Sequence, residues 1–471
     1  MAHHKHSNKI IHLKQLFIFI FGVALWFSPT PDGLTLQAWH LFSIFISIIL
    51  AVILEAFPIF TASIIGLSFS VLTTTLTPKE AYSGFSQSFI LLIIVAFLIA
   101  RGVIKSGLGK RIAFLIIKKF GKSSLGLGYS MIAADMFIAP AFPSNTARSG
   151  VLFPIVNALA ADSGSKVADG TRKKLGAYLM MTSMAGITIS SAMWLTAMAA
   201  NPAGVKMAQE FGVNISFGSW ALAAFLPTLL AFIAIPWVLF KLFPPEIKHT
   251  PNAPEIAKQE LEHMGNIHKN EYIMGFTFIA MVTLWVLSPV FGFDKTAVAF
   301  LGLAALMISN IFTMDDLAHE GRALGTLIWF AILYSMSSEL NHLGFMSWLG
   351  DHISTFVIGY SWQMVYVLLV LAYVFIHYFF VSQTAQMLAL FSVFLGVGVN
   401  TGVPAELLAL MLLFATNFNA MITPQGSSAN VIYLGSGYIL SNEVYKYGGI
   451  ITLLNSFIYL VFGSFWIIAV V

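Results

Sequence analysis

Pro143-Ser144-Asn145-Thr146-Ala147-Arg148 stands in the middle of an apolar stretch of the sequence, and Ser382-Gln383-Thr384-Ala385-Gln386 stands in a second one. The serines of the two motifs, at positions 144 and 382, are 238 positions apart. Polar residues at membrane depth are costly and usually mark a pathway or a binding site. Two such motifs in corresponding places predict a transporter built from duplicated halves, with its substrate held between them.

The composition is that of a protein with many membrane spans. Of the 471 residues, 58% are hydrophobic and only 9% are charged, whereas a soluble domain carries about 25% charged residues. The chain is long enough for about eleven apolar helices of roughly 20 residues each. Its net charge of +4 is too small to indicate a nucleic-acid surface. The absence of cysteine excludes disulfides, iron–sulfur clusters and thiol chemistry.

Long apolar runs predict an all-α polytopic membrane protein with about eleven transmembrane helices and two re-entrant hairpins. The hairpins are predicted at about 125–161 and 362–398, because each stretch is too long for one span and is broken near its centre by a polar motif. Such irregular backbone is tolerated at membrane depth only inside protein or beside a cavity. The predicted spans lie at roughly 15–29, 38–57, 60–76, 87–104, 175–199, 217–243, 272–292, 296–312, 323–340, 404–421 and 448–470.

The polar segment Pro244–Asn270 divides the chain into two halves. Glycines recur at a nearly constant offset, for example Gly107 with Gly344. Each half has an odd number of spans when the first helix is set aside, so the tandem halves must be inverted in the membrane. The predicted domains are an N-terminal tail and first transmembrane helix (1–30), a first inverted repeat (31–245), a cytoplasmic linker (246–271) and a second inverted repeat (272–471).

The basic residues predict the orientation. When the N-terminus is placed in the cytoplasm, only Lys79, Lys206 and Lys295 of the 24 lysines and arginines fall outside, and Arg148 is left in the membrane interior. We therefore expect a multi-pass protein of the cell inner (plasma) membrane, with a cytoplasmic N-terminus and an outside C-terminus. The first hairpin then opens from the cytoplasm and the second from the outside.

At each hairpin tip a new half-helix is expected to begin near the serine. The first N–H groups of a helix lack partners and carry partial positive charge, so each tip is a candidate anion cradle. A small dicarboxylate fits two such cradles, with one carboxylate in each. The alternative is that these polar residues only pack helices together. The predicted substrate-binding residues at the tips are Ser144, Asn145, Thr146, Ser382, Gln383 and Thr384.

Each half also has a later helix with a polar break. An unwound stretch that faces a hairpin tip supplies backbone carbonyls, which can coordinate Na⁺ or complete a substrate site. The first break has an alternative interpretation as the ordinary end of a span. Thr423 and Pro424 are predicted to bind substrate, and the candidate ion-coordinating residues are Thr196, Ala197, Asn201, Ile422 and Gly426.

Charged and titratable residues flank the tips. Arg148 lies one turn after Ser144 on the same helical face, so its guanidinium is in reach of a substrate carboxylate. Asp135 lies about as far before the tip as Arg148 lies after it, and a buried Arg148–Asp135 pair is the alternative. In the second hairpin, His377 and Gln386 occupy comparable places and are predicted to be structural or to tune the site.

Two clusters resemble metal sites in the sequence: the N-terminal histidines His3, His4 and His6, which we interpret as part of a solvated tail, and the acidic loop Met314–Glu320. Asp315 or Asp316 as a helix N-cap explains this cluster without a metal. We predict no metal site and no organic cofactor, and Na⁺ is the one candidate coupling ion.

At these motifs the chain resembles the divalent anion:sodium symporter family, and within it the exchanger-like branch of citrate/succinate antiporters and 2-oxoglutarate/malate translocators. The supporting stretches are Pro31–Leu34, Ala38–Phe42, Pro143–Arg148, Ser382–Ala385 and Gly435–Tyr438. The resemblance implies an elevator-type homodimer in which a transport domain slides against a scaffold. The chain departs from related translocators at Gln386, where histidine is common, and at Gln425, where an aromatic residue is common.

Together these features predict a secondary active transporter of C4–C5 dicarboxylates such as malate, succinate or 2-oxoglutarate, working by anion exchange. A sodium-coupled di- or tricarboxylate symporter is the first alternative. A membrane-embedded enzyme is a second, although the sequence lacks His-Glu-x-x-His, and a passive anion channel is a third. The expected partners are small dicarboxylate anions, the lipid bilayer and a second copy of the chain, with no nucleic acid.

Overall fold

The computed structural model describes residues 2–357 and 359–471, except for the side chains of residues 2–9 and 322. Its first part, up to the polar segment, contains α1 (Ala2–Trp26), α2 (Leu36–Ile53), α3 (Ile59–Leu72), α4 (Pro78–Ala81), α5 (Ser88–Ser106), α6 (Leu108–Phe120), α7 (Ser124–Ile138), α8 (Asn145–Asp162), α9 (Gly176–Met193), α10 (Ala200–Gln209) and α11 (Phe217–Leu242). The remainder contains α12 (Ala253–Met264), α13 (Lys269–Phe291), α14 (Lys295–Ile308), α15 (Met314–Ala318), α16 (Gly321–His342), α17 (Phe345–Ser354), α18 (Trp362–Ile376), α19 (Gln383–Asn400), α20 (Ala405–Phe418), α21 (Ser428–Gly435), α22 (Ser441–Glu443), α23 (Gly449–Ile458) and α24 (Ser464–Val470).

Every predicted span position contains a helix, but the sequence analysis missed several shorter helices. Ten helices of the described chain are long and apolar enough to cross a membrane, and three of these are hairpin arms. The predicted linker is not simply irregular, because it contains α12. Short helices also follow two of the spans, as α6 and α17. These helices are too short or too polar to register as apolar runs.

The two hairpins have the same construction. In the first, α7 is followed by the 3₁₀ turn Ala139–Ala141 and by α8, and in the second, α18 is followed by the 3₁₀ turn His377–Phe379 and by α19. Each boundary in the second hairpin lies 238 positions after its counterpart, as 382 follows 144. The serines that precede α8 and α19 share one backbone conformation, with φ −145° and ψ 118° at Ser144 and φ −143° and ψ 119° at Ser382.

Other elements recur at a similar offset. Gly107 and Gly344 both have left-handed backbones, with φ of 78° and 79°, and each joins a long helix to a short one. Thr77 and Thr313 each begin a short helix with a capping box. The prediction of Asp315 or Asp316 as the N-cap was therefore wrong, because Thr313 is the N-cap and Asp316 accepts its backbone N–H from the third helical position.

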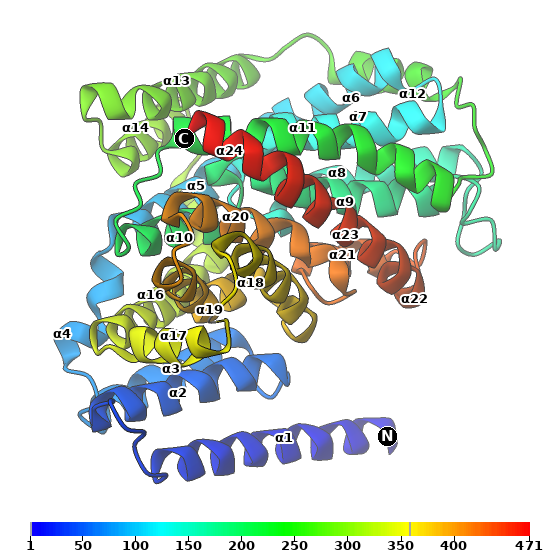
Figure 1. The fold of residues 1–471 in the computed structure, drawn as a ribbon. Helices are drawn as coiled ribbons and strands as arrows, with labels where there is room; N and C mark the ends of the chain where they lie inside the picture. The colour runs from blue at the N-terminus through cyan, green and yellow to red at the C-terminus, as the bar shows by residue number, and fades with distance from the viewer. Residues whose placement is uncertain (1, 358) are drawn as a thin grey trace.

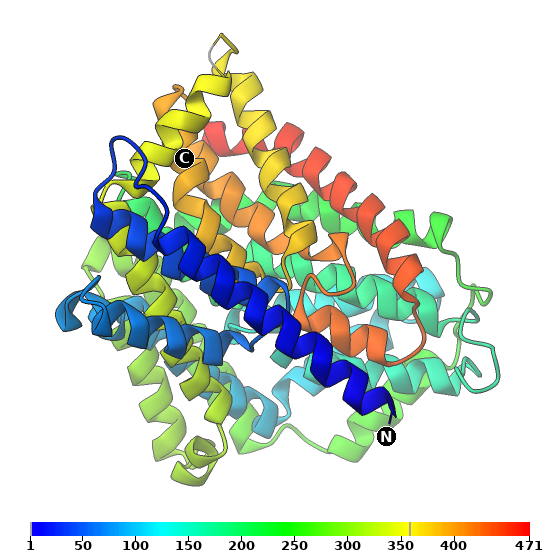
Figure 2. The same ribbon diagram turned by 90° about the horizontal axis from the view of Figure 1, so that it is seen from below.

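The helices pack as two groups (Figure 1). The scaffold group consists of α2, α3, α5, α13, α14 and α16, and the hairpin group consists of α7 to α11, α18 to α21, α23 and α24. α1 lies along α2 at the edge of the molecule, and Figure 2 shows it crossing diagonally in front of the other helices when seen from below. α6 leads from α5 into the first hairpin, and α17 leads from α16 into the second.

The linker helix α12 packs on α6 and fixes its position. Arg111 of α6 is buried, forms an ion pair with Glu271 and donates to the carbonyl oxygen of Gly265 at 3.1 Å. The hydrogen bond to Glu271 raises the pKa of Arg111 above its ordinary value. This ion pair ties the entrance of the first hairpin to the end of the linker.

Candidate functional site

The two hairpin tips meet directly. The side-chain amide of Asn145 donates to Gln383 Oε1 at 3.2 Å, and both side chains are buried. Ser144 Oγ accepts the backbone N–H of Ala147 at 3.2 Å, and Ser382 Oγ accepts that of Ala385 at the same distance. Both serines are therefore N-caps, as the sequence predicted, and the N-termini of α8 and α19 converge on one region.

A cavity of about 1210 Å³ lies between the tips and the scaffold group. Phe60, Arg101 and Trp329 line its scaffold side. On the hairpin side it is lined by all six residues that were predicted to bind substrate at the tips, namely Ser144, Asn145, Thr146, Ser382, Gln383 and Thr384. The helix N-termini therefore face open space, where an anion can reach their N–H groups.

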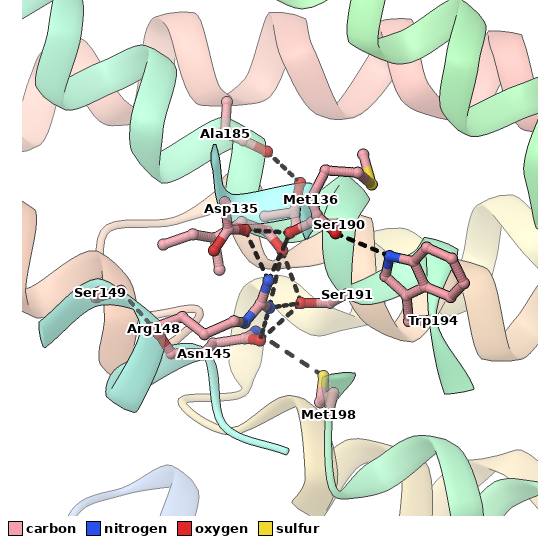
Figure 3. Close-up of polar contacts among 12 residues, drawn as sticks. Asp135, Met136, Asn145, Arg148, Ser149, Ala185, Ser190, Ser191, Trp194 and Met198 are labelled. Carbon is pink, nitrogen blue, oxygen red and sulfur yellow. Dashed lines mark hydrogen bonds and ion pairs between the residues drawn. The ribbon is translucent and has the colours of Figure 1, made fainter. Parts of the chain in front are cut away.

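Arg148 is held inside the hairpin group and its guanidinium does not line this cavity (Figure 3). Its side chain has no exposed surface, and its Nη1 lies 2.7 Å from Oδ2 of Asp135, which is 1% exposed. Of the two roles left open by the sequence, the structure places Arg148 in the pair with Asp135. The remaining hydrogen bonds of the guanidinium go to Ser190 Oγ (2.6 Å), Asn145 Oδ1 (2.7 Å), Ser191 Oγ and the carbonyl oxygen of Ile187 (3.3 Å).

These contacts set the orientation of Asn145. Its Oδ1 accepts from Arg148 and from Ser191, both at 2.7 Å. An amide whose oxygen faces two donors must turn its NH₂ group the other way, and here that group faces Gln383 and Met198 Sδ. Arg148 therefore acts on the tip as a positioning residue, through Asn145.

Gln383 is fixed in the same manner from the other side. Its NH₂ group donates to the backbone carbonyl oxygens of Thr416 and Asn417, at 2.7 and 2.9 Å. Its Oε1 is therefore the atom that faces Asn145. Because each amide is oriented by its own half of the protein, the contact between the tips is preorganised.

His377 and Gln386 connect the second hairpin to the second break. His377 Nδ1 lies 2.7 Å from Gln386 Oε1, and His377 Nε2 lies 2.8 Å from the carbonyl oxygen of Gly426. Gln386 also donates to the carbonyl oxygen of Tyr373 at 2.6 Å and accepts from Asn419 at 2.9 Å. Both residues are fully buried, do not line the cavity and support the second tip from inside the protein.

The first break is a true interruption within the hairpin group, so the alternative of an ordinary span end was wrong. α9 ends at Met193, a 3₁₀ turn follows at Leu195–Ala197, and the chain re-enters a helix as α10. Thr196 donates to the carbonyl oxygen of Pro140 at 2.7 Å, and Asn201 Oδ1 accepts from Asn417 at 2.9 Å. Thr196 and Asn201 thus connect the break to the first tip and to α20, while Ala197 is fully buried in the turn.

The second break follows the 3₁₀ turn Asn419–Ile422. Thr423 and Pro424 were predicted to contact substrate, but they are buried and do not line the cavity. Gly426 also faces inward, with its carbonyl oxygen on His377. Thr423 Oγ1 and Asn419 Oδ1 are buried without a hydrogen-bond partner in the described chain. Neutral oxygens of this kind are the ligands that a hard cation such as Na⁺ prefers.

Two serines that the sequence analysis passed over lie on the cavity wall instead. Ser427 is the N-cap of α21 and Ser428 is its first residue, and both line the cavity. The pair stands directly before an apolar run, which is the usual sequence signature of a helix start. That signal was present, but the sequence does not show that this helix start faces the tips.

Comparison with known proteins identifies relatives over the whole chain. The family described as "Sodium:sulfate symporter transmembrane region" matches residues 9–471. YflS of Bacillus subtilis (strain 168) is 42% identical, with 99% of this chain and 98% of YflS covered. Dicarboxylate transporter 1, chloroplastic, of Spinacia oleracea is also 42% identical, with 94% of this chain and 79% of that protein covered.

Two solved structures share the fold at low sequence identity. The YdaH transporter of Alcanivorax borkumensis has a TM-score of 0.58 at 14% identity, covering 85% of this chain and 89% of YdaH. MtrF of Neisseria gonorrhoeae has a TM-score of 0.55 at 13% identity, covering 98% and 96%. The predicted all-α polytopic membrane fold is confirmed.

Proposed function

The chain belongs to the sodium:sulfate symporter family, and from this premise we propose that it is a secondary active transporter of C4–C5 dicarboxylates such as malate, succinate and 2-oxoglutarate. The plant relatives are named dicarboxylate transporters, and the provisional name of YflS points to malate. The chain is a transporter and not an enzyme, because its relatives and its fold are those of transporters.

One observation carries the proposal, which is that two capped helix N-termini open onto one cavity. Each tip presents a serine cap, an amide and a threonine hydroxyl toward the cavity. Each helix N-terminus offers N–H groups and partial positive charge to one carboxylate. Two such ends, one from each hairpin, suit an acid with two carboxylates. A cradle without a full counter-charge also allows the acid to be released.

We propose exchange as the transport mode. The Arg148–Asp135 pair is buried inside the first hairpin, and Arg148 orients the amide of that tip. No dissociable cation has to accompany the acid for this orientation to hold. The unpartnered oxygens of Thr423 and Asn419 favour the alternative, Na⁺ symport.

Membrane vesicles separate the two modes. Exchange predicts uptake that requires internal dicarboxylate and does not respond to a Na⁺ gradient. Uptake into empty vesicles driven by a Na⁺ gradient would instead establish symport. Unsaturable flux without counterflow would indicate a passive channel.

We further propose that the two halves are inverted repeats and that transport uses an elevator motion. We also propose that the protein lies in the plasma membrane and forms a homodimer. The ion pair Arg172–Glu443, at 2.8 Å, joins two segments that the basic residues place in the cytoplasm. Trp348 donates to the carbonyl oxygen of Asp32 at 2.8 Å, and both are predicted to lie outside. These contacts support the predicted grouping of the segments on two sides of the membrane, and the distribution of the basic residues supports a cytoplasmic N-terminus and an outside C-terminus. The cavity reaches Arg101 and therefore opens toward the cytoplasm in this orientation.

The proposed site is tested by Ser144→Ala combined with Ser382→Ala, with Ser123→Ala combined with Ser361→Ala as the matched control. The control serines cap the other arms of the same hairpins, by accepting from Gly126 at 3.1 Å and Met364 at 3.4 Å. Each lost cap costs about 1 kcal/mol in either variant. We expect only the tip variant to lose dicarboxylate binding, as measured by calorimetry on purified protein. Normal affinity in the tip variant would refute the site.

A further inference from the structure

The hairpin tips are alike in both halves, but the breaks beside them present different chemistry to the cavity. The first break contributes Met198 and Ala199, whereas the second contributes Ser427 and Ser428. Ser428 is exposed to the cavity, whereas Met198 and Ala199 offer no hydroxyl. The frame proposed to grip two carboxylates is therefore similar at its two ends, but of the two breaks only the second, which marks the polar end, brings side-chain hydroxyls to the cavity.

A direct contact marks the polar end. The hydroxyl of Ser428 is hydrogen-bonded to the hydroxyl of Thr146, a residue of the first tip. Thr384 is the counterpart of Thr146 in the second tip and also lines the cavity, but its hydroxyl has no hydrogen-bond partner in the part of the chain that the structure describes. The two threonines thus differ in their surroundings despite their equivalent positions.

The two hydroxyls of Thr146 and Ser428 can form further hydrogen bonds with a third group. Two hydroxyls that share one hydrogen bond use only one of their two hydrogens, so the other O–H is free to donate. Both oxygens also keep lone pairs that can accept. A ketone oxygen needs one donor, and an alcohol group needs one donor and one acceptor. The Thr146–Ser428 pair satisfies either, next to the cradle that the first tip offers to a carboxylate.

We propose that Ser428, together with Thr146, recognises the oxygen on C2 of a 2-hydroxy or 2-oxo dicarboxylate and thereby fixes which end of the acid lies at the first tip. This inference rests on the proposed function. The substituted end lies between the first tip and α21, and the unsubstituted end lies at the second tip, beside Thr384. An unsubstituted acid such as succinate fits the same two cradles without this hydrogen bond.

The test compares malate, 2-oxoglutarate and succinate as competitors of labelled succinate on purified protein. In the parent protein we expect the two oxygenated acids to bind better than succinate. In Ser428→Ala we expect their advantage to fall by about three- to tenfold, the equivalent of one neutral hydrogen bond, while succinate affinity is unchanged. Ser428→Thr keeps a hydroxyl and should retain the preference.

Ser436→Ala is the control, because Ser436 follows the other end of α21 and does not line the cavity. It should leave all three affinities unchanged. If Ser428→Ala weakens succinate as much as malate, or changes neither, the inference is overturned while dicarboxylate binding stands. If the parent protein binds none of the three acids, the proposed function itself fails and the inference fails with it.

Discussion

The buried pair of Arg148 and Asp135 should make a large contribution to stability that depends on both partners. In Arg148→Gln the carboxylate of Asp135 stays almost fully buried and keeps Ser190 as its one side-chain partner. Asp135 Oδ1 has no hydrogen-bond partner in the described chain even when Arg148 is present. Asp135→Asn leaves a guanidinium among neutral acceptors. Breaking a buried pair from one side typically costs about 3–5 kcal/mol, because the other charge stays buried without compensation.

The double variant distinguishes the interaction between Arg148 and Asp135 from the contacts that each residue makes with its other neighbours. Asp135→Asn with Arg148→Gln leaves no buried charge and replaces two polar groups with two amides of similar size. We therefore expect its free energy of unfolding to fall by clearly less than the sum of the two single losses. Arg148→Gln should also weaken dicarboxylate binding, because Asn145 loses one of the two donors that orient its amide.

Thermal and denaturant unfolding in detergent micelles, followed by tryptophan fluorescence, measures these losses. Lys258→Gln is the reference, because the Lys258–Glu255 pair is exposed and such pairs contribute at most about 1 kcal/mol. The reasoning is refuted if Arg148→Gln costs no more than Lys258→Gln, or if the losses of the two single variants simply add in the double variant.

Two further perturbations test the Lys105–Asp316 ion pair and the second break. Lys105 holds the pKa of Asp316 down to about 2, from an ordinary 3.8. This stabilisation is present above about pH 4 and is lost as the pH falls toward 2, so Asp316→Asn should lower the unfolding temperature at pH 7 and have little effect at pH 2. A Cβ on Gly448 would lie 2.2 Å from the carbonyl oxygen of Met421, whereas one on Gly449 would meet nothing within 4 Å. Gly448→Ala should therefore cost about 1–3 kcal/mol of unfolding free energy and weaken substrate binding, while Gly449→Ala should do neither.

The parts of the site that depend on local sequence were predictable. A serine that follows a helix breaker and precedes a helical run caps the new helix wherever the chain folds, because cap and N–H group are only three residues apart. Ser144 and Ser382 were placed correctly for this reason. The hairpins were predictable as well, because a polar tip inside a long apolar stretch has few other solutions in a membrane.

The parts that depend on packing were not predictable. Arg148 had two plausible partners in the sequence, and only the depth of Asp135 beside Ser190 decides between them. Thr423 and Pro424 follow the visible break in the second half and were therefore preferred to Ser428. The chain turns inward at those two residues and returns to the cavity only at the start of α21. Sequence alone gives the interruption of a helix but not the direction in which each of its residues points.

Some features of the site depend on local sequence and others on packing between distant segments, and this difference has a consequence for substrate specificity. In the proposed site, the grip on two carboxylates comes from backbone N–H groups at two capped helix ends, which any sequence with the right caps can supply. Discrimination among acids of equal charge must come from side chains between those ends, because the carboxylates are common to all of them. The Thr146–Ser428 contact joins residues 282 positions apart in sequence, one from each half. A duplicated frame can therefore hold an unsymmetrical acid once the helix starts at its two breaks differ, as Ser427 and Ser428 of α21 differ from Ala199 and Ala200 of α10.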